Sequence, residues 1–179
     1  MTKRLCLIHT INKFMDMIYN PFAKPFAEAN PEVEIFNIMD DSLLADTLKA
    51  GALTNNVARR ILGYVYSAEA AGADVCMVTC TSVNQAAAYA RRFANIPVFN
   101  IDEPVARAAV AMGGRIGVLG TLPTSPGAIV RLVDEESARQ GKNLKCVTAV
   151  ATGAFDVLCA GDRNKHDEMV EEALHKLAK

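Results

Sequence analysis

The 179-residue sequence contains no tryptophan, few aromatic residues and no excess of charge of either sign. Its 19 basic and 20 acidic residues give a formal net charge of −1. Nucleic-acid surfaces need clustered basic residues, often beside aromatic rings on which bases stack, and membrane surfaces need basic or amphipathic segments. The composition therefore indicates neither a nucleic-acid partner nor a membrane partner.

Long hydrophobic runs are also missing. No apolar run approaches the roughly 20 residues needed to span a bilayer. The run that follows Lys3 and Arg4 is only about five residues long and ends at His9, which is too short for a signal peptide. The five cysteines are odd in number and lie mostly in apolar, strand-like segments, which favours reduced thiols over a disulfide framework. We therefore expect a cytoplasmic protein.

What the sequence does contain is a regular alternation of strand-like and helix-like segments, in a chain that is 51% hydrophobic. Strands are expected at residues 4–9, 33–38, 75–78, 97–101, 115–120 and 144–150. Helices are expected at residues 13–29 (interrupted by prolines), 54–71, 83–93, 103–112, 126–140 and 165–178. This alternation, with short connections, predicts an α/β fold with mostly parallel sheets.

The strand and helix pattern restarts halfway along the chain. Leu5–Thr10 aligns with Ile116–Thr121, and both segments are strands that end in threonine, 111 residues apart. We therefore expect two similar lobes, residues 1–100 and residues 101–179. The same offset places the counterpart of Cys80 beyond Lys179, so the second lobe is expected to lack its final strand.

The segment around Cys80 carries the clearest chemical signal. The apolar run Val75–Val78 leads into Cys80 and small polar residues, and an alanine-rich helical stretch follows at once. Strand carboxyl ends are where ligands bind in open α/β sheets, and a helix start favours an anion or a thiolate. Cys80 could thus be an acid/base thiol, although a buried structural role is the commoner fate of a free cysteine.

Several other candidate residues have a structural explanation as well as a functional one. Cys6, Cys76 and Cys146 lie within strand bodies and are expected in the core, and no metal site is expected because no histidine accompanies Cys76 and Cys80. A strand-end histidine such as His9 is more often structural than catalytic. Three hydroxyl residues at a strand-to-helix turn could bind a carboxylate, cap the helix, or do both: Thr121, Thr124 and Ser125.

Three segments, in order, are similar to the aspartate/glutamate racemase superfamily: Asp74–Ser82, Ile96–Ile101 and Arg115–Ser125. That superfamily includes amino-acid and hydantoin racemases, maleate isomerases and arylmalonate decarboxylases, and the resemblance extends from Lys3 to about Asp162. It implies two α/β lobes with a cleft between them, no cofactor, and one cysteine per lobe. One thiolate removes the α-proton, and the other thiol reprotonates the opposite face.

Carried over to this sequence, the resemblance makes Cys80 the first-lobe catalytic cysteine. It also implies a set of substrate-binding residues from both lobes: Thr10, Asn12, Thr81, Ser82, Asn84, Thr121, Thr124 and Ser125. The usual Cys-Asn-Thr reads Cys80-Thr81-Ser82 here, which leaves the substrate class open. The second cysteine would follow the strand beyond Lys179, and Cys159 lies before the last helix, not after it.

The resulting hypothesis is a cofactor-independent racemase or isomerase of amino-acid metabolism. It would act on a small amino-acid-like, dicarboxylate or hydantoin substrate and could form a homodimer. Two alternatives remain open: a binding protein or degenerate homologue without racemase activity, and a single-cysteine enzyme of the decarboxylase type.

Overall fold

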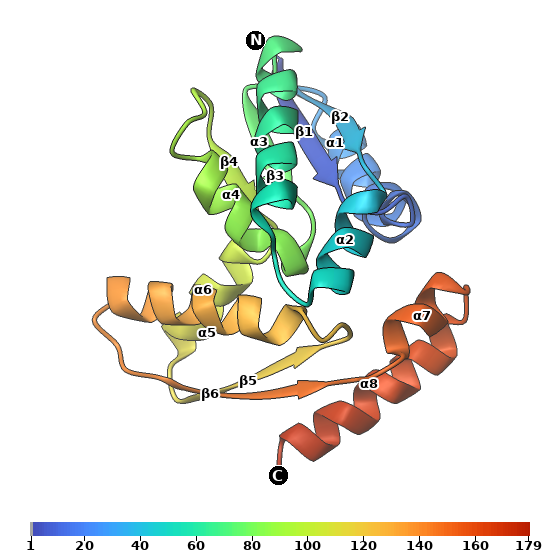
Figure 1. The fold of residues 1–179 in the computed structure, drawn as a ribbon, viewed down its shortest axis with the longest axis vertical. Coiled ribbons are helices and arrows are strands. Elements are labelled where there is room, and N and C mark those ends of the chain that lie inside the picture. Colours follow the sequence, from blue (N-terminus) through green and yellow to red (C-terminus); the bar gives the residue numbers. More distant parts are fainter. Residues whose placement is uncertain (1) are drawn as a thin grey trace. The chain divides into compact units, whose positions relative to one another are not determined.

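The computed structural model describes residues 2–179, and the chain divides into two compact units, Met1–Ile101 and Asp102–Lys179. The first unit is built on a parallel sheet of four strands in the order β2-β1-β3-β4 (Figure 1). These strands are β1 (Lys3–His9), β2 (Val33–Met39), β3 (Val75–Val78) and β4 (Val98–Asn100). The predicted α/β fold with parallel sheets is confirmed.

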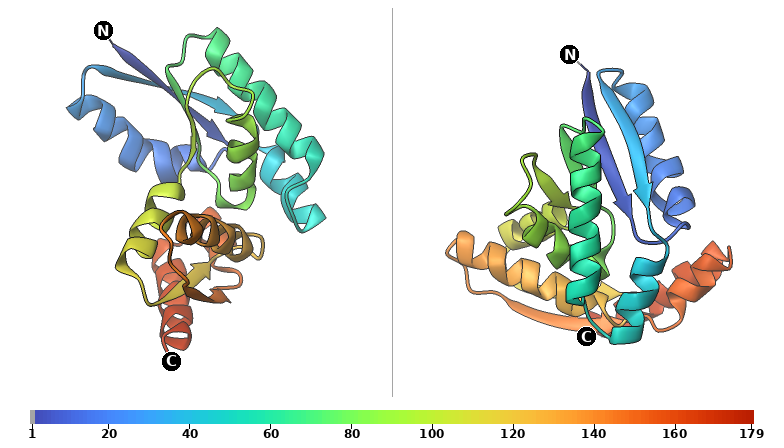
Figure 2. Two further views of the ribbon diagram at one scale, coloured as in Figure 1. Left: turned by 90° about the vertical axis from the view of Figure 1, so that its left-hand side faces the viewer. Right: turned by 45° about the horizontal axis from the view of Figure 1, so that its top comes forward.

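Strand β1 lies in the middle of this sheet, between β2 and β3. Its residues Cys6, Leu7 and Ile8 are all completely buried. A continuous apolar run is typical of a parallel strand that is covered on both faces, because each alternate side chain meets a helix. Figure 2 shows these helices, with α3 on one side of the sheet and α1 on the other.

The helices of the first unit are η1 (Met15–Ala23), α1 (Lys24–Ala29), α2 (Ser42–Ala50), α3 (Asn55–Ala70), η2 (Thr81–Val83) and α4 (Asn84–Ala90). Element η1 is a π-helix that contains Pro21, and Pro25 lies in the first turn of α1, where a missing N–H costs least. The Thr54 hydroxyl caps α3 by accepting a hydrogen bond from the Val57 N–H at 3.2 Å. Helix α2 had not been predicted as a separate element.

Helix α2 starts beside a polar cluster centred on Asp40. Asp40 Oδ1 accepts a hydrogen bond from the Ser42 N–H at 3.1 Å, as expected of a residue that caps a helix. Its Oδ2 pairs with Arg60 and accepts the Tyr64 hydroxyl at 2.6 Å. Although burial opposes it, these hydrogen bonds, led by that of Tyr64, lower the pKa of Asp40. The cluster thus ties α2 to α3.

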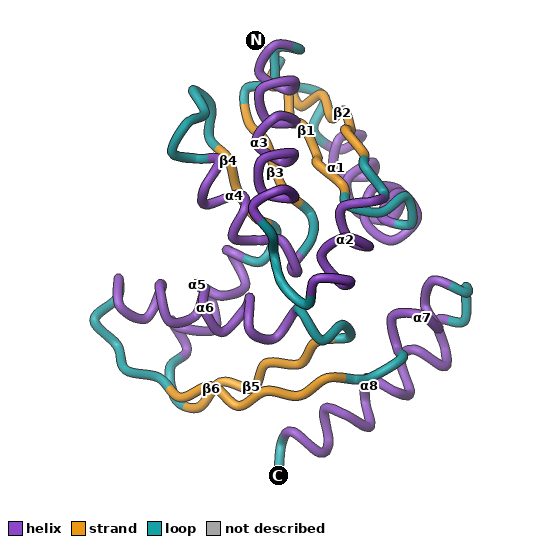
Figure 3. The backbone as a smooth tube through the Cα atoms, viewed as in Figure 1, coloured by secondary structure: helices purple, strands orange, loops and turns teal. Residues whose placement is uncertain are grey.

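The second unit contains α5 (Glu103–Met112), β5 (Arg115–Gly120), α6 (Ser125–Arg139), β6 (Lys145–Val150), α7 (Ala154–Cys159) and α8 (Arg163–Leu177). Strands β5 and β6 form a parallel two-stranded sheet. Helices α5 and α6 lie on one side of it and α8 on the other (Figure 3). Ala106 and Val110 of α5 pack against Leu132 and Val133 of α6 to form the core of the unit.

The internal repeat extends to the pairing of the strands. Leu5 pairs with Ile35 in the first sheet, and Ile116 pairs with Cys146 in the second. Both partners are displaced by the same 111 residues, so the two strand pairs share one register. Strand β1 has a second neighbour, β3, whereas β5 pairs only with β6 within residues 2–179. No helix in this part of the chain combines the length and apolar character needed to cross a bilayer.

Candidate active site

The candidate site lies where the strands of the first sheet end. Ile8 of β1 pairs with Val78 of β3, and Val78 pairs with Asn100 of β4. Thr10 and Cys80 each lie two residues beyond the Ile8–Val78 pair, so they follow strands that end side by side. Parallel strands bring their carboxyl ends to one edge of a sheet, which is the usual position of ligand sites in such folds.

Cys80 occupies the junction between β3 and the helical segment that follows. It has an extended backbone (φ −126°, ψ 124°) and precedes η2, a short 3₁₀ turn. Helix α4 begins only at Asn84, so the turn of η2 separates the thiol from the regular helix, in contrast to the direct strand-to-helix junction that we expected. Cys80, Ser82 and Asn84 are all buried, and Thr81 is half-buried.

Asn100 is a buried residue of this site that the sequence analysis did not identify. Its Nδ2 donates hydrogen bonds to the backbone carbonyls of Val78 at 3.2 Å and Cys80 at 3.3 Å. An amide at the end of an otherwise apolar strand was the available signal, since buried polar side chains need partners. Asn100 therefore holds the backbone of Cys80 from the β4 side.

Thr10 is completely buried, yet its Oγ1 has no hydrogen-bond partner among residues 2–179. Its carbonyl accepts the Leu44 N–H at 3.3 Å, which connects the end of β1 to helix α2. Buried hydroxyls nearly always have a partner, because leaving one unpaired costs free energy. Asn12, the other candidate in this loop, is exposed.

The three second-unit candidates lie together at the turn from β5 to α6. Thr124 is the N-cap residue of α6, but its side chain does not form the capping hydrogen bond, and the Ser125 N–H donates to the Leu122 carbonyl at 3.1 Å. The turn is tight, because a Cβ atom added to Gly120 would lie 3.0 Å from Pro126 Cδ. Thr121, like Thr124 and Ser125, is half-buried.

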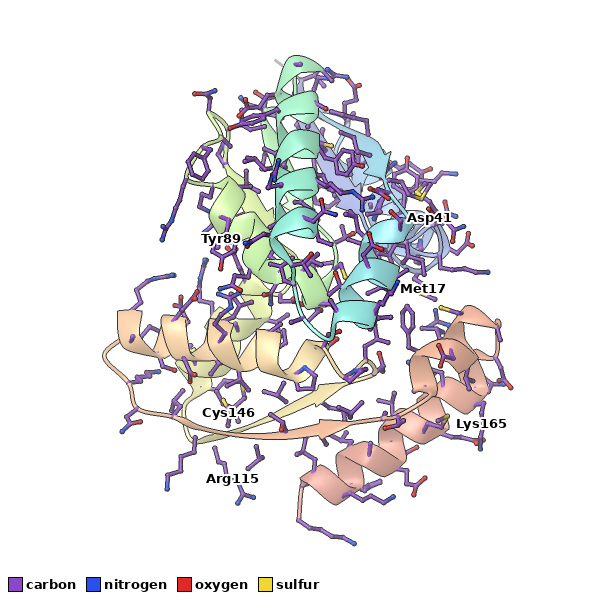
Figure 4. The ribbon with its side chains drawn as sticks, viewed as in Figure 1. Met17, Asp41, Tyr89, Arg115, Cys146 and Lys165 are labelled. Carbon is purple, nitrogen blue, oxygen red and sulfur yellow. The ribbon has the colours of Figure 1, made fainter. Side chains whose placement is uncertain are left out.

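Two of the remaining cysteines, Cys6 and Cys146, are in settings that disfavour a thiolate. All five cysteines are thiols. Cys6 and Cys76 pair across β1 and β3, and the hydrogen bond to Cys76, together with burial, raises the pKa of Cys6. Burial also raises the pKa of Cys146, which packs between β6 and the helices of the second unit (Figure 4). Residues 2–179 contain no cluster of three metal-ligating side chains.

His9 lies at the end of β1 and is completely buried. Its Nδ1 is 2.8 Å from Thr79 Oγ1, and its Nε2 is 2.9 Å from Asn37 Oδ1. Burial lowers the pKa of His9, which favours the neutral ring, against a smaller opposing effect of Asn37. Both ring nitrogens are thus occupied, as expected of a structural histidine.

The fold places the chain in the broad class of α/β proteins built on parallel sheets. Within that class, the chain belongs to the Asp/Glu/Hydantoin racemase family, whose sequence model matches residues 19–179. No curated protein sequence matches the chain significantly.

Solved structures of racemases share the fold. Allantoin racemase from Klebsiella pneumoniae is 16% identical, with a TM-score of 0.66 over 98% of this chain and 69% of that one. A glutamate racemase from Bacillus anthracis is 17% identical, with a TM-score of 0.65 over 99% of this chain and 64% of the Bacillus enzyme. Glutamate racemase from Aquifex pyrophilus is 21% identical, with a TM-score of 0.56 over 81% of this chain and 54% of the Aquifex enzyme. The chain thus spans little more than half of the Aquifex enzyme.

Proposed function

We propose that this protein is a cofactor-independent racemase or isomerase in which the Cys80 thiolate removes the α-proton of a small amino-acid-like, dicarboxylate or hydantoin substrate. The observation that carries the proposal is that Cys80 follows β3 at the sheet edge where the neighbouring strand β1 also ends, and that the Thr10 hydroxyl beyond β1 is buried without a hydrogen-bond partner among residues 2–179. A carboxylate or carbonyl oxygen of a substrate would supply the partner that Thr10 lacks.

The chemistry requires the α-proton to pass from carbon to sulfur. The electron pair of the C–H bond then spreads onto the adjacent carboxyl or carbonyl group as an enolate-like anion. Hydrogen-bond donors aimed at that oxygen stabilise the developing charge, and this is usually the largest contribution to catalysis. We assign this role to Thr10, Thr81, Ser82 and Asn84 in the first unit, with Asn12 at its margin.

The hydroxyls of the second unit have a related role in this proposal. We assign a substrate-binding role to Thr121, Thr124 and Ser125 as well, since their turn leads directly into α6. Thr121 is the repeat counterpart of Thr10, which supports an equivalent role in the two halves.

The smallest reaction that Cys80 can perform alone is exchange of the α-proton with solvent. If the thiol returns a solvent deuteron to the same face, the substrate keeps its configuration and gains deuterium. Inversion requires a second acid on the opposite face. In the described part of the second unit, Cys146 lies within β6 and Cys159 ends α7, so neither occupies a strand end.

Deuterium exchange measured by proton NMR tests the proposal directly. The protein is incubated in D₂O with each enantiomer of aspartate, glutamate, allantoin and 5-benzylhydantoin. We expect exchange with at least one compound, and a loss of about a thousandfold or more in Cys80→Ala, the scale of removing an essential acid/base group. Cys159→Ala, a half-buried thiol outside the site, is the matched control and should retain the rate. Equal rates in Cys80→Ala and the wild type would reject the assignment.

One observation favours a second candidate function. Because Cys80 is the one cysteine within residues 2–179 that lies just beyond the carboxyl end of a strand, a reaction needing a single proton donor also suits the site. In decarboxylation of a disubstituted malonate, the C–C bond to one carboxylate breaks, CO₂ leaves, and the Cys80 thiol protonates the enolate. Release of CO₂ from phenylmethylmalonate would favour this reaction if the amino acids and hydantoins tested above show no exchange of their α-protons. Calorimetric binding of a dicarboxylate with neither reaction would favour a binding protein.

A further inference from the structure

Three strands of the first sheet are joined by a chain of side-chain hydrogen bonds, which is partly buried at Asn37 and buried at His9 and Thr79. Asn37 of β2 contacts His9 of β1 at 2.9 Å, and His9 contacts Thr79, just beyond β3, at 2.8 Å. His9 is completely buried and Thr79 is 3% exposed. The Phe14 ring packs edge-on against the imidazole, with the ring centres 6.4 Å apart. The imidazole is thus fixed from three sides.

The Thr79 hydroxyl lies between two partners on β1. Its oxygen is 2.8 Å from His9 Nδ1 and 3.2 Å from the Ile8 carbonyl oxygen, to which the hydroxyl donates. On the other side of the imidazole, His9 Nε2 is 2.9 Å from Asn37 Oδ1. The side chain of Thr79 therefore has a single favoured orientation, set by β1 and β2.

Thr79 immediately precedes Cys80, and the peptide that joins them is held from both neighbouring strands. On the β1 side, the Thr79 N–H donates to the Ile8 carbonyl at 3.1 Å and its hydroxyl binds His9. On the β4 side, Asn100 donates to the Cys80 carbonyl at 3.3 Å. Because side chains alternate along an extended chain, Thr79 faces His9 while Cys80 faces the other side of the sheet.

We propose that His9 is a positioning residue for Cys80, acting through the Thr79 hydroxyl from the opposite face of the sheet. With Thr79 anchored, the peptide between it and Cys80 has one orientation, and so does the Cα–Cβ bond that carries the thiol. Reactive groups held by a second set of contacts lose less alignment to local motion, and small misplacements are costly in proton transfer. This inference rests on the proposed function for its catalytic meaning, but its structural content can be tested without any substrate.

The test measures how well the thiol is held, by native-state alkylation with iodoacetamide. Mass spectrometry of the peptide that contains both Cys76 and Cys80 gives the ratio of their alkylation rates. Cys76 is completely buried within β3 and reports general opening of the sheet, whereas Cys80 reports opening of the strand end. We expect Thr79→Val, which removes the hydroxyl at nearly constant shape, to raise the Cys80-to-Cys76 ratio about tenfold, through local opening.

Conservative variants separate positioning from general stability. Thr79→Ser keeps the hydroxyl and should keep the ratio within about twofold of the wild type. In His9→Asn the side-chain amide nitrogen can occupy the position of Nδ1, and in His9→Gln that of Nε2. His9→Gln should therefore raise the ratio as Thr79→Val does, and His9→Asn should raise it less. Ile61→Val, a core truncation on α3, should accelerate alkylation of both cysteines equally.

Each outcome decides the inference. The inference is supported if the Cys80-to-Cys76 alkylation ratio rises in Thr79→Val and His9→Gln but stays closer to the wild-type value in Thr79→Ser and His9→Asn. The inference is overturned if the alkylation ratio is unchanged in Thr79→Val and His9→Gln. It is also overturned if the ratio rises equally in these two variants and in their conservative counterparts. Where the wild type exchanges α-protons, Thr79→Val should lower kcat about tenfold with KM within twofold. If the wild type exchanges none, the proposed function fails while the alkylation ratio still decides whether His9 positions Cys80.

Discussion

Replacing Thr10 by valine should stabilise the protein and impair its proposed function at the same time. Valine has nearly the shape of threonine, so the change removes the buried hydroxyl without opening a cavity. The Thr10 hydroxyl is completely buried and has no hydrogen-bond partner within residues 2–179. Leaving such a group unpaired costs about 1–3 kcal/mol, and a methyl group in its place removes that cost.

Thr47→Val is the matched control for this prediction. Thr47 is equally buried and belongs to the same unit, but its Oγ1 donates to the Leu43 carbonyl at 2.8 Å. Removing a satisfied hydroxyl should lower the free energy of unfolding by about 1 kcal/mol, so the two variants should shift stability in opposite directions. For a chain of this size, 1 kcal/mol corresponds to a shift in Tm of about 2–4 °C.

The assay must report the first unit alone, because the chain forms two units and contains no tryptophan. Pulsed alkylation of Cys76 during a urea titration does this, since Cys76 is completely buried in β3. We expect Thr10→Val to raise the urea midpoint and Thr47→Val to lower it, while Thr10→Val also lowers α-proton exchange at least tenfold. A lower midpoint in Thr10→Val, equal to that of Thr47→Val, would refute the idea that Thr10 lacks a partner.

Four further predictions concern other residues of the structure. Asn100→Ala should lower the free energy of unfolding by about 1–3 kcal/mol and raise the alkylation rate of Cys80, because the backbone carbonyls of Val78 and Cys80 each lose the hydrogen bond from Asn100. Burial lowers the pKa of His9, so the unfolded chain binds a proton at this residue more readily than the folded chain does. The free energy of unfolding should therefore fall as the pH drops below about 6.5. His9→Gln should flatten this part of the pH profile in urea titrations. Gly120→Ala should destabilise the second unit by about 1–3 kcal/mol in thermal unfolding, because the new methyl group would press on the proline of the β5–α6 turn. Gly127→Ala, in open space on α6, should stabilise it by about 0.5–1 kcal/mol.

The strands were the most predictable part of the fold. Val75–Val78 and Arg115–Gly120 have the predicted bounds, because each is a short segment rich in apolar residues between turn residues. The short helices α2 and α7 were not predicted. Each follows a strand after a few residues, and few positions remain in which a helical period can be recognised.

The site was predictable only in part. Cys80 stands out because it follows an apolar run directly, and Thr10 because it repeats at Thr121. The contacts of Asn100 and His9 were not predictable, since they join residues at least 20 positions apart through strand order and register. Nor can a sequence indicate that a hydroxyl such as that of Thr10 is buried without a partner.

The alternation of side chains at the end of β3 has a consequence for how the protein tolerates change. Thr79 and Cys80 are adjacent in sequence but serve opposite faces of the sheet. Inserting one residue before Thr79 would turn the hydroxyl away from His9 and direct the thiol toward it. Every side chain of the site would still be present, yet each would face the wrong environment. We therefore expect the number of residues in this strand to vary little among relatives, and length variation to be confined to the loops on either side.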